Sequence, residues 1–448
     1  MSSFPTHPPM ALKPKVSIVT LGCAKNAADT DTLARLLKAR GYTLADDARE
    51  ADAIIVHTCS FIEAAKKESI DAVLQAGRLK TKGKKLIVTG CLVQQHGQEI
   101  FDELPEVDAF LGTGQLAQVP DLLERPRGRF LDRARPGGFM DPDEPLARRA
   151  NGPSAFLRLS EGCRHPCSFC VIPRLRGAVQ SRSAELIVRE ARELAAQGVE
   201  ELSVIAQDTG DWGWEGNAPG ELPALLRSLG EIPGVRWIRL MYMHPASFSP
   251  ALLELFAEAP ERFTYLDMPL QHIDSQVLAV MKRKTDEAGL RRRLDQIHSR
   301  APSLALRTTF IVGFPGETDA QFERLLGFVK EGHFDYLGAF AYSQEEGTPA
   351  AHLADQIPED VKQGRLAALT DAYYGVAHAK AQKRLGTVET VLLEESEADG
   401  ILGRTRREAP EIDAVVRLPR QAARRGRFVT ARLTGYDAHE FTAVPHPS

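Results

Sequence analysis

The sequence lacks a long apolar segment, a surplus of one charge and an abundance of cysteine, and each absence excludes a class of protein. No apolar run is long enough to span a bilayer, and residues 1–15 lack the apolar core of a signal peptide. The formal net charge is -4, which gives no bulk attraction to nucleic acid or to an anionic membrane. We therefore expect a cytoplasmic enzyme without a membrane partner, built from two or three domains because 448 residues exceed one hydrophobic core.

Cysteine is scarce, and its distribution is informative. The chain has six cysteines, and a reducing cytoplasm argues against a disulfide framework. Three of them are dispersed, at Cys23, Cys59 and Cys91, and three are crowded, at Cys163, Cys167 and Cys170. Because no cysteine is left over, we predict two separate sets of three, each holding an iron–sulfur cluster.

The dispersed set follows the strands of a predicted α/β domain over residues 14–125. Apolar runs alternate there with amphipathic helical patterns, which predicts an open parallel sheet. The runs lie at 16–20, 53–57 and 86–89. The first helix is expected to start at Asp29 or Thr30 and to end at Gly41. Each run leads to one cysteine, and although a buried free cysteine is common, three at equivalent strand ends favour a shared site.

Beyond this domain the pattern changes twice. Residues 126–153 are rich in proline, glycine and arginine and are interpreted as a linker. Residues 154–383 alternate strand and helix patterns, which predicts a full or partial parallel barrel. Its expected strands are 156–159, 202–205, 237–242, 265–268, 306–312 and 336–342. Residues 384–448 hold five short β-like runs and predict a small antiparallel barrel.

The strongest local signal is the CxxxCxxC spacing of Cys163, Cys167 and Cys170, directly after a predicted strand. Three thiolates in one tight loop can hold three irons of a 4Fe-4S cluster and leave the fourth iron without a protein ligand. That open iron can chelate S-adenosylmethionine, whose reductive cleavage yields a carbon radical. The alternative is zinc with His165 as a fourth ligand, but structural zinc sites favour paired CxxC knuckles, and the chain has no second one.

Further residues could line a cofactor pocket. An apolar strand runs into a glycine turn over 309–317, where the backbone can approach a ligand closely. The segment 267–272 ends another strand, and Asp208 follows an earlier one. Each of these segments also fits an ordinary strand–helix connection or a capped turn. The candidate cofactor contacts are Phe169, Gln207, Gln271, Gly313 and Gly316.

The chain is similar to the methylthiotransferase family of radical S-adenosylmethionine enzymes from about residue 15 to 445, and the resemblance rests on seven segments. They are LGCAKN (21–26), HTCSFI (57–62), TGCL (89–92), EGCRHPCSFC (161–170), RGAVQSR (176–182), MPLQH (268–272) and IVGFPGET (311–318). The resemblance implies a second 4Fe-4S cluster on the dispersed cysteines, a radical cluster on the crowded ones in a central open barrel, and a C-terminal TRAM β-domain.

The resemblance also implies a reaction, in which a methylthio group replaces a hydrogen on carbon. One S-adenosylmethionine supplies the methyl group, another is cleaved to the 5′-deoxyadenosyl radical, and flavodoxin or ferredoxin is the expected electron donor. One branch of the family modifies an adenosine in transfer RNA. The other modifies the β-carbon of an aspartate in ribosomal protein S-twelve of the small subunit. Segments 21–26, 58–69 and 340–350 resemble the protein-modifying branch.

Charge favours the same branch independently. Residues 384–448 contain ten arginines and ten acidic residues, whereas a domain that grips a polyanion should be clearly basic. A local patch could still form, although we expect a solvated face balanced by carboxylates. The arginines concerned are Arg404, Arg406, Arg407, Arg424, Arg425 and Arg427. Transfer RNA is therefore the less favoured substrate, and a non-catalytic iron–sulfur carrier is disfavoured by the open-iron loop and the complete barrel.

Three residues depart from the family pattern, and none of them is a cluster ligand. They are Ala24, His57 and Ala414. Ala414 replaces a glycine, which could alter a turn of the β-domain and the docking of substrate if that position needs a positive φ.

Overall fold

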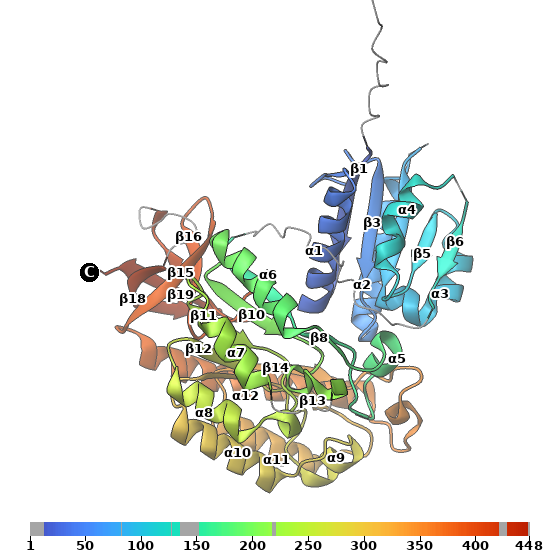
Figure 1. The fold of residues 1–448 in the computed structure, drawn as a ribbon. Helices are drawn as coiled ribbons and strands as arrows, with labels where there is room; N and C mark the ends of the chain where they lie inside the picture. Colours follow the sequence, from blue (N-terminus) through green and yellow to red (C-terminus); the bar gives the residue numbers. More distant parts are fainter. Residues whose placement is uncertain are drawn as a thin grey trace, which may run out of the picture. The chain divides into compact units, whose positions relative to one another are not determined.

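The computed structural model describes residues 13–81, 83–126, 128–134, 152–216, 221–420 and 428–446 (Figure 1). The chain divides into two compact units, Met1–Leu146 and Ala147–Ser448. Most of the predicted linker lies outside the described residues, as do Arg424, Arg425 and Arg427.

The first unit is a parallel six-stranded sheet with the order β2-β1-β3-β4-β5-β6. Its strands are β1 (Lys15–Thr20), β2 (Thr43–Leu44), β3 (Ala53–Thr58), β4 (Lys85–Gly90), β5 (Ala109–Leu111) and β6 (Phe130–Asp132). Its helices are α1 (Ala24–Ala39), α2 (Glu63–Arg78), α3 (Cys91–Glu103), η1 (Leu116–Gln118) and α4 (Val119–Glu124). Successive residues of β3 belong to two different apolar clusters. Ile55 lies in one cluster, and Ile54 and Val56 lie in the other, so helices cover both faces of the sheet.

One local prediction for this unit was wrong, and the short strand β6 has no counterpart among the predicted strands. Helix α1 begins directly after Cys23, about five residues before the expected start, because Cys23 takes the extended N-cap conformation without a capping side chain. Strand β6 comes from the stretch interpreted as linker, since a three-residue edge strand is too short to show a periodic pattern. The helix does end near Gly41, whose φ is 85°.

The second unit contains an open parallel sheet with the order β14-β13-β12-β11-β10-β7. Its strands are β7 (Ser154–Arg158), β10 (Glu201–Ile205), β11 (Trp237–Leu240), β12 (Phe263–Asp267), β13 (Ala305–Val312) and β14 (Tyr336–Ala341), with a separate short pair β8 (Ser160–Glu161) and β9 (Gln180–Ser181). Figure 1 shows a layer of helices along the outer side of this sheet, and their apolar residues form one large core with the strands. The result is a partial parallel barrel.

All helices of this unit except the last lie between successive strands of the open sheet, as parallel pairing requires. They are α5 (Ile172–Arg176), α6 (Ala184–Ala196), α7 (Leu222–Gly230), α8 (Pro250–Glu258), α9 (Ser275–Val280), α10 (Glu287–Arg300), α11 (Asp319–Lys330) and α12 (Glu359–Arg384). Short 3-10 turns are η2 (Thr209–Asp211), η3 (Trp214–Gly216), η4 (Pro245–Ser247) and η5 (Pro349–His352). Helix α12 leads from the sheet to the last part of the chain.

The last five strands form a closed barrel with the order β15-β16-β17-β19-β18. They are β15 (Val388–Ser396), β16 (Ile401–Thr405), β17 (Val415–Leu418), β18 (Phe428–Asp437) and β19 (Glu440–Pro445). The prediction of an antiparallel barrel needs one correction, because β17 and β19 pair in parallel. Five strands closed into a ring cannot all alternate in direction, so one parallel pair is unavoidable.

This barrel docks on the amino ends of the strands of the open sheet through buried ion pairs. Arg404 of β16 is 1% exposed, and its Nη2 donates to Oε1 of Glu201 on β10 over 2.9 Å. Arg239 of β11 donates to the other oxygen of the same carboxylate over 2.9 Å. The expected solvated arginine face is therefore wrong for Arg404. The carboxylate partner lies 203 residues away in sequence, so a local pattern could not reveal it.

The predicted fold class is confirmed: two parallel α/β sheets and a small all-β barrel. The four-part division of the chain at the predicted boundaries stays a prediction. Among the described residues, no helix is long and apolar enough to cross a membrane.

Candidate metal centres and cofactor pocket

The crowded cysteines lie in a loop at the carboxyl end of β7 that only glycine could begin. Gly162 has a φ of 80°, and a Cβ there would lie 2.0 Å from the carbonyl oxygen of Ala178. The next residue, Cys163, donates its N–H to the carbonyl of Gly177 over 3.1 Å. A turn from Cys167 to Cys170 closes the loop through a 3.1 Å backbone hydrogen bond.

Of the three cysteines of this loop, Cys167 is buried, and Cys163 and Cys170 are half-buried. Burial is the main cause that raises the pKa of Cys163 and of Cys170 to about 12, and the adjacent Cys167 adds to it. Thiols so placed need a cation to become thiolates, and bound iron supplies one. Three thiols in one loop are therefore compatible with a metal cluster, which would supply the positive charge that lets them ionise.

A second segment holds the loop from outside. Ser168 lies between the second and third cysteines, and its hydroxyl donates to the carbonyl of Val280 over 2.8 Å. Its backbone N–H donates to the carbonyl of Met281 over 3.2 Å. The carboxyl end of α9 is thus fixed against the cysteine loop.

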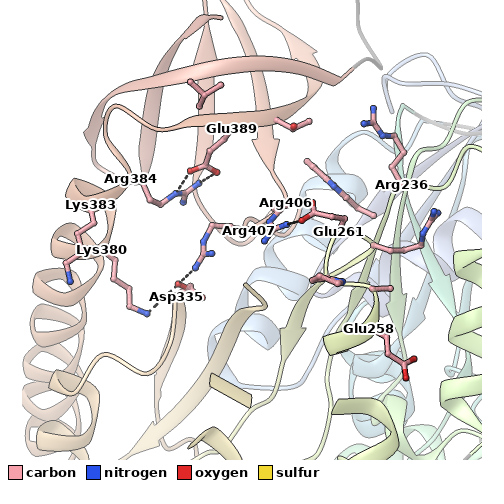
Figure 2. Close-up of a pocket in the computed structure, with 16 residues that line it drawn as sticks. Arg236, Glu258, Glu261, Asp335, Lys380, Lys383, Arg384, Glu389, Arg406 and Arg407 are labelled. Atoms are coloured by element: carbon pink, nitrogen blue, oxygen red, sulfur yellow. Dashed lines mark hydrogen bonds and ion pairs between the residues drawn. The ribbon is translucent and has the colours of Figure 1, made fainter. Parts of the chain in front are cut away.

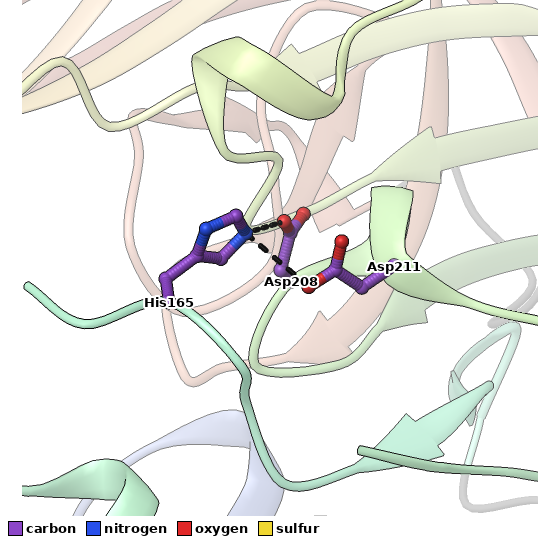
Figure 3. A group of neighbouring side chains, drawn as sticks. All are labelled: His165, Asp208 and Asp211. Carbon is purple, nitrogen blue, oxygen red and sulfur yellow. Dashed lines mark hydrogen bonds and ion pairs between the residues drawn. The ribbon is translucent and has the colours of Figure 1, made fainter. Parts of the chain in front are cut away.

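His165 points toward carboxylates (Figure 3). Its Nε2 lies 2.7 Å from Oδ2 of Asp208 and 3.2 Å from Oδ2 of Asp211, and its ring stacks on His244 at 3.9 Å. Burial lowers the pKa of His165, but the two carboxylates outweigh it and raise that pKa. The zinc alternative treated His165 as a fourth ligand beside the three cysteines. In the structure its Nε2 instead lies next to two carboxylates. These ligand atoms are the one trio in the described part of the chain within 4.8 Å of one another.

The candidate cofactor contacts lie at the carboxyl ends of β10, β12 and β13. The amide nitrogen of Gln207 donates to Oε1 of Glu161 over 2.9 Å, while its Oε1 is buried without a hydrogen-bond partner. Gln271, with a φ of 73°, also has a buried and unpartnered Oε1, and so has Nε2 of His272. Buried polar atoms cost free energy unless they are paired, so the two glutamine oxygens are candidates to accept hydrogen bonds from a ligand, whereas Nε2 of His272 faces Oε2 of Glu317 at 3.8 Å.

The glycine turn lies beside the cysteine loop. Gly313 and Gly316 have φ values of 69° and 80°, and a Cβ on Gly313 would meet Cγ of Lys362 at 2.4 Å. Phe314 belongs to a small apolar cluster that Phe169 packs against. The structure therefore brings Phe169 from the cysteine loop to the turn that carries the two glycines.

The dispersed cysteines also follow the carboxyl ends of neighbouring strands. Cys23 comes after β1, Cys59 after β3, and Cys91 is the first residue of α3 after β4. A Cβ on Gly22 would lie 2.9 Å from Sγ of Cys59, so the loops after β1 and β3 touch. Strand order reverses between β1 and β3, which is where open α/β sheets bind ligands.

The buried side-chain amide of Asn26 holds the loops of this second set together. This role of Asn26 was not predicted from the sequence. Asn26 is 1% exposed and donates to the carbonyls of Leu21 over 2.7 Å and of Thr58 over 3.1 Å. It thereby ties the two loops together. Cys23 and Cys91 stand at the amino ends of α1 and α3, where helix dipoles favour negatively charged groups.

A separate cavity of about 1110 Å3 lies where the small barrel meets α12 and the amino ends of the strands (Figure 2). Most of the charges that line it are paired. Arg407 donates to Asp335 over 2.7 Å, and Arg406 pairs with Glu261 at 2.8 Å. The cavity is at the opposite end of the strands from the cysteine loop.

Three family models match the chain. The uncharacterized protein family UPF0004 matches residues 15–112, the radical SAM superfamily 157–329 and the TRAM domain 385–445. Among solved structures, the radical S-adenosylmethionine methyltransferase TsrM from Kitasatospora setae, with cobalamin and a 4Fe-4S cluster bound, has a TM-score of 0.55. It is 15% identical and covers 75% of this chain and 77% of its own, a likeness that concerns the fold alone.

Curated relatives are much more similar in sequence. A protein of Pelobacter propionicus named ribosomal protein uS12 methylthiotransferase RimO is 43% identical over 433 residues, which is 94% of this chain and 96% of that protein. A protein of the same name from Anaeromyxobacter sp. (strain Fw109-5) is 41% identical over 96% of this chain and 93% of its own length.

Proposed function

Because the chain belongs to the RimO family of ribosomal protein uS12 methylthiotransferases, we propose that it methylthiolates the β-carbon of an aspartate in that ribosomal protein. The mechanism is that of a radical S-adenosylmethionine enzyme. The observation that carries the proposal is the pair of cysteine sets, each at the carboxyl edge of its own parallel sheet.

Cys163, Cys167 and Cys170 would hold the radical 4Fe-4S cluster. When bound, that cluster supplies the electron that cleaves S-adenosylmethionine to a carbon radical. The chain's own part is to orient the cofactor and to exclude water. The oxygens of Gln207 and Gln271 that lack a hydrogen-bond partner can accept N–H bonds from it, and the partly buried Phe169 would give the site an apolar side.

A second 4Fe-4S cluster on Cys23, Cys59 and Cys91 belongs to the same proposal. Two helix amino ends and the strand-order reversal support an anionic group at this edge. Since this set needs no open site for radical formation, we assign it to handling sulfur. The electron donor, of the flavodoxin or ferredoxin kind, is likewise a proposal.

A protein substrate is favoured over transfer RNA because described arginines of the C-terminal region are paired with carboxylates. Arg404 and Arg417 of the barrel, and Arg384 at the end of α12, each pair with at least one glutamate, and residues 384–448 are formally neutral. Affinity for RNA comes largely from cations that are free to neutralise phosphates. Transfer RNA remains the second candidate substrate, because the two branches share their cluster chemistry.

One reconstitution tests the proposal. Anaerobic holoenzyme, S-adenosylmethionine, a reductant and a sulfide source are incubated with the ribosomal protein or with transfer RNA, and both are analysed by mass spectrometry. We expect the mass gain of a methylthio group on the protein only. A gain on RNA alone would replace this function with the second candidate. No gain on either, without 5′-deoxyadenosine, would indicate an iron–sulfur carrier.

A further inference from the structure

Arg283 is a buried cation beside the crowded cysteines. It is 4% exposed, its Nη1 donates to Sγ of Cys167 over 3.5 Å, and its Nη2 donates to the carbonyl of Pro269. Its Nε is buried without a hydrogen-bond partner. No carboxylate of the described residues lies within ion-pair distance of this guanidinium. By contrast, buried Arg239 and Arg404 share the carboxylate of Glu201.

The backbone around Arg283 is held in an unusual conformation. Lys282 and Lys284 on either side have φ values of 58° and 52°, in the left-handed region that non-glycine residues avoid. Both lysines are exposed, whereas Arg283 between them is buried. A left-handed conformation is strained for a residue with a side chain, and such strain persists where the surroundings demand it. The strained turn directs one of three consecutive cations inward.

An uncompensated guanidinium in a protein interior destabilises the folded chain, so buried charges normally have a partner. The group that faces Arg283 is the cysteine loop. A 4Fe-4S cluster on three thiolates is an anion, and one-electron reduction makes it more negative. We propose that Arg283 is the counter-charge of the radical cluster and raises its reduction potential, an inference that rests on the proposed function.

The physical basis is a difference between two oxidation states. Hydrogen bonds to cluster sulfurs and nearby charge both tune the potential of iron–sulfur centres. Arg283 supplies both, and it interacts more strongly with the reduced cluster because that state has one more negative charge. Arg283 therefore acts through the cluster, as a positioning residue, by favouring its reduced state. The electron itself comes from an external one-electron reductant.

The test is a redox titration of the full chain with dithionite, followed by the EPR signal of the reduced cluster. All variants carry Cys23→Ala, Cys59→Ala and Cys91→Ala, so that only the radical cluster gives a signal. At the parent midpoint potential, Arg283→Gln should lower the ratio of reduced to oxidised cluster about tenfold, a negative shift of about 59 mV. Arg283→Lys should recover most of the shift. Arg324→Gln removes an exposed cation that pairs with Asp274 next to α9, and it should leave the midpoint unchanged.

Thermal unfolding tests the counter-charge role of Arg283 even if a variant binds iron poorly. Without the cluster, Arg283 lacks its counter-charge, so Arg283→Met should raise the thermal unfolding midpoint of the iron-free chain. With the cluster bound, the same change should lower that midpoint. An unchanged potential in Arg283→Gln, or a lower midpoint for Arg283→Met in the iron-free chain, would overturn the inference. Absence of any reduced-cluster signal in the parent would instead overturn the proposed function.

Discussion

Individual cysteines in the two sets have different neighbours. Cys163 shares one short loop with the other two thiols of its set, and Phe169 of that loop packs against the apolar cluster that contains Phe314 of the glycine turn. Cys59 instead belongs to a loop that contacts a different strand connection through Gly22. These surroundings support separate tasks, because only the first set adjoins residues that could bind S-adenosylmethionine.

We predict that Cys163→Ala abolishes formation of 5′-deoxyadenosine, since it removes a ligand of the radical cluster. Cys59→Ala should leave 5′-deoxyadenosine measurable while it stops sulfur insertion into the ribosomal protein. Chromatography of the nucleoside and mass spectrometry of the protein check the two outcomes. Equal loss of 5′-deoxyadenosine in both variants would refute the division of labour.

At the scale of elements, the loop between β16 and β17 inserts an acidic group into the open sheet. Asp413 accepts hydrogen bonds from the hydroxyl of Tyr265 over 2.6 Å and from the N–H of Ala409 over 2.9 Å. Burial raises the pKa of Asp413 to about 7, even though Arg307 lies 3.5 Å away. The positive φ in this loop falls on Glu411, so Ala414 is not strained by its side chain.

The pKa of Asp413 makes the stability of the second unit depend on pH. Its pKa is 3.8 in the reference state and about 7 when folded, so the folded chain holds this proton more tightly. The contribution to stability is full below about pH 4 and is lost as the pH rises to about 7, by at most about 4 kcal/mol. Asp413→Asn keeps an acceptor oxygen and should lack this loss. Thermal unfolding between pH 4 and 8 checks it.

The matched control for that measurement is Asp437→Asn, at an exposed position of β18. It should follow the wild-type pH profile. A profile of Asp413→Asn that also coincides with wild type would mean that the aspartate is ionised throughout this range.

At the scale of the whole second unit, the small barrel is a fixed part of the enzyme. Glu201 receives both Arg239 and Arg404, and all three side chains are almost completely buried. A second link joins Tyr336 of β14 to Glu408, over 2.7 Å, and Glu408 to Arg384 at the end of α12. The barrel thus presents its surface in a defined orientation to the sheet that holds the radical site.

We predict that Glu201→Ala weakens this docking, because two buried guanidinium groups lose their shared carboxylate. The expected cost is about 3–5 kcal/mol. Glu440→Ala removes a partly exposed ion pair with Arg417 within the barrel and should cost less than about 1 kcal/mol. Thermal unfolding gives both values, and limited proteolysis should release the barrel earlier from Glu201→Ala. Similar resistance of the two variants to protease would contradict the fixed docking.

Apolar runs were sufficient to predict the main strands, since a strand covered on both faces is buried along its whole length, as β3 is, and is therefore mostly apolar. The CxxxCxxC loop could also be predicted, because its three cysteines lie within eight residues of sequence. What escaped prediction depends on distant partners. Arg404 needs Glu201, His165 needs Asp208 and Asp211, and the inward turn of Arg283 depends on two left-handed lysines that no sequence pattern marks.

The parallel pair in the small barrel has a consequence for biosynthesis. Strand β19 lies between β17 and β18, although it is the last of the five to be made. Until it is inserted, β17 and β18 each expose an unpaired edge, and such edges attract other chains. The nascent barrel therefore stays open until β19 leaves the ribosome, and loss of β19 alone would turn a closed module into one prone to aggregation.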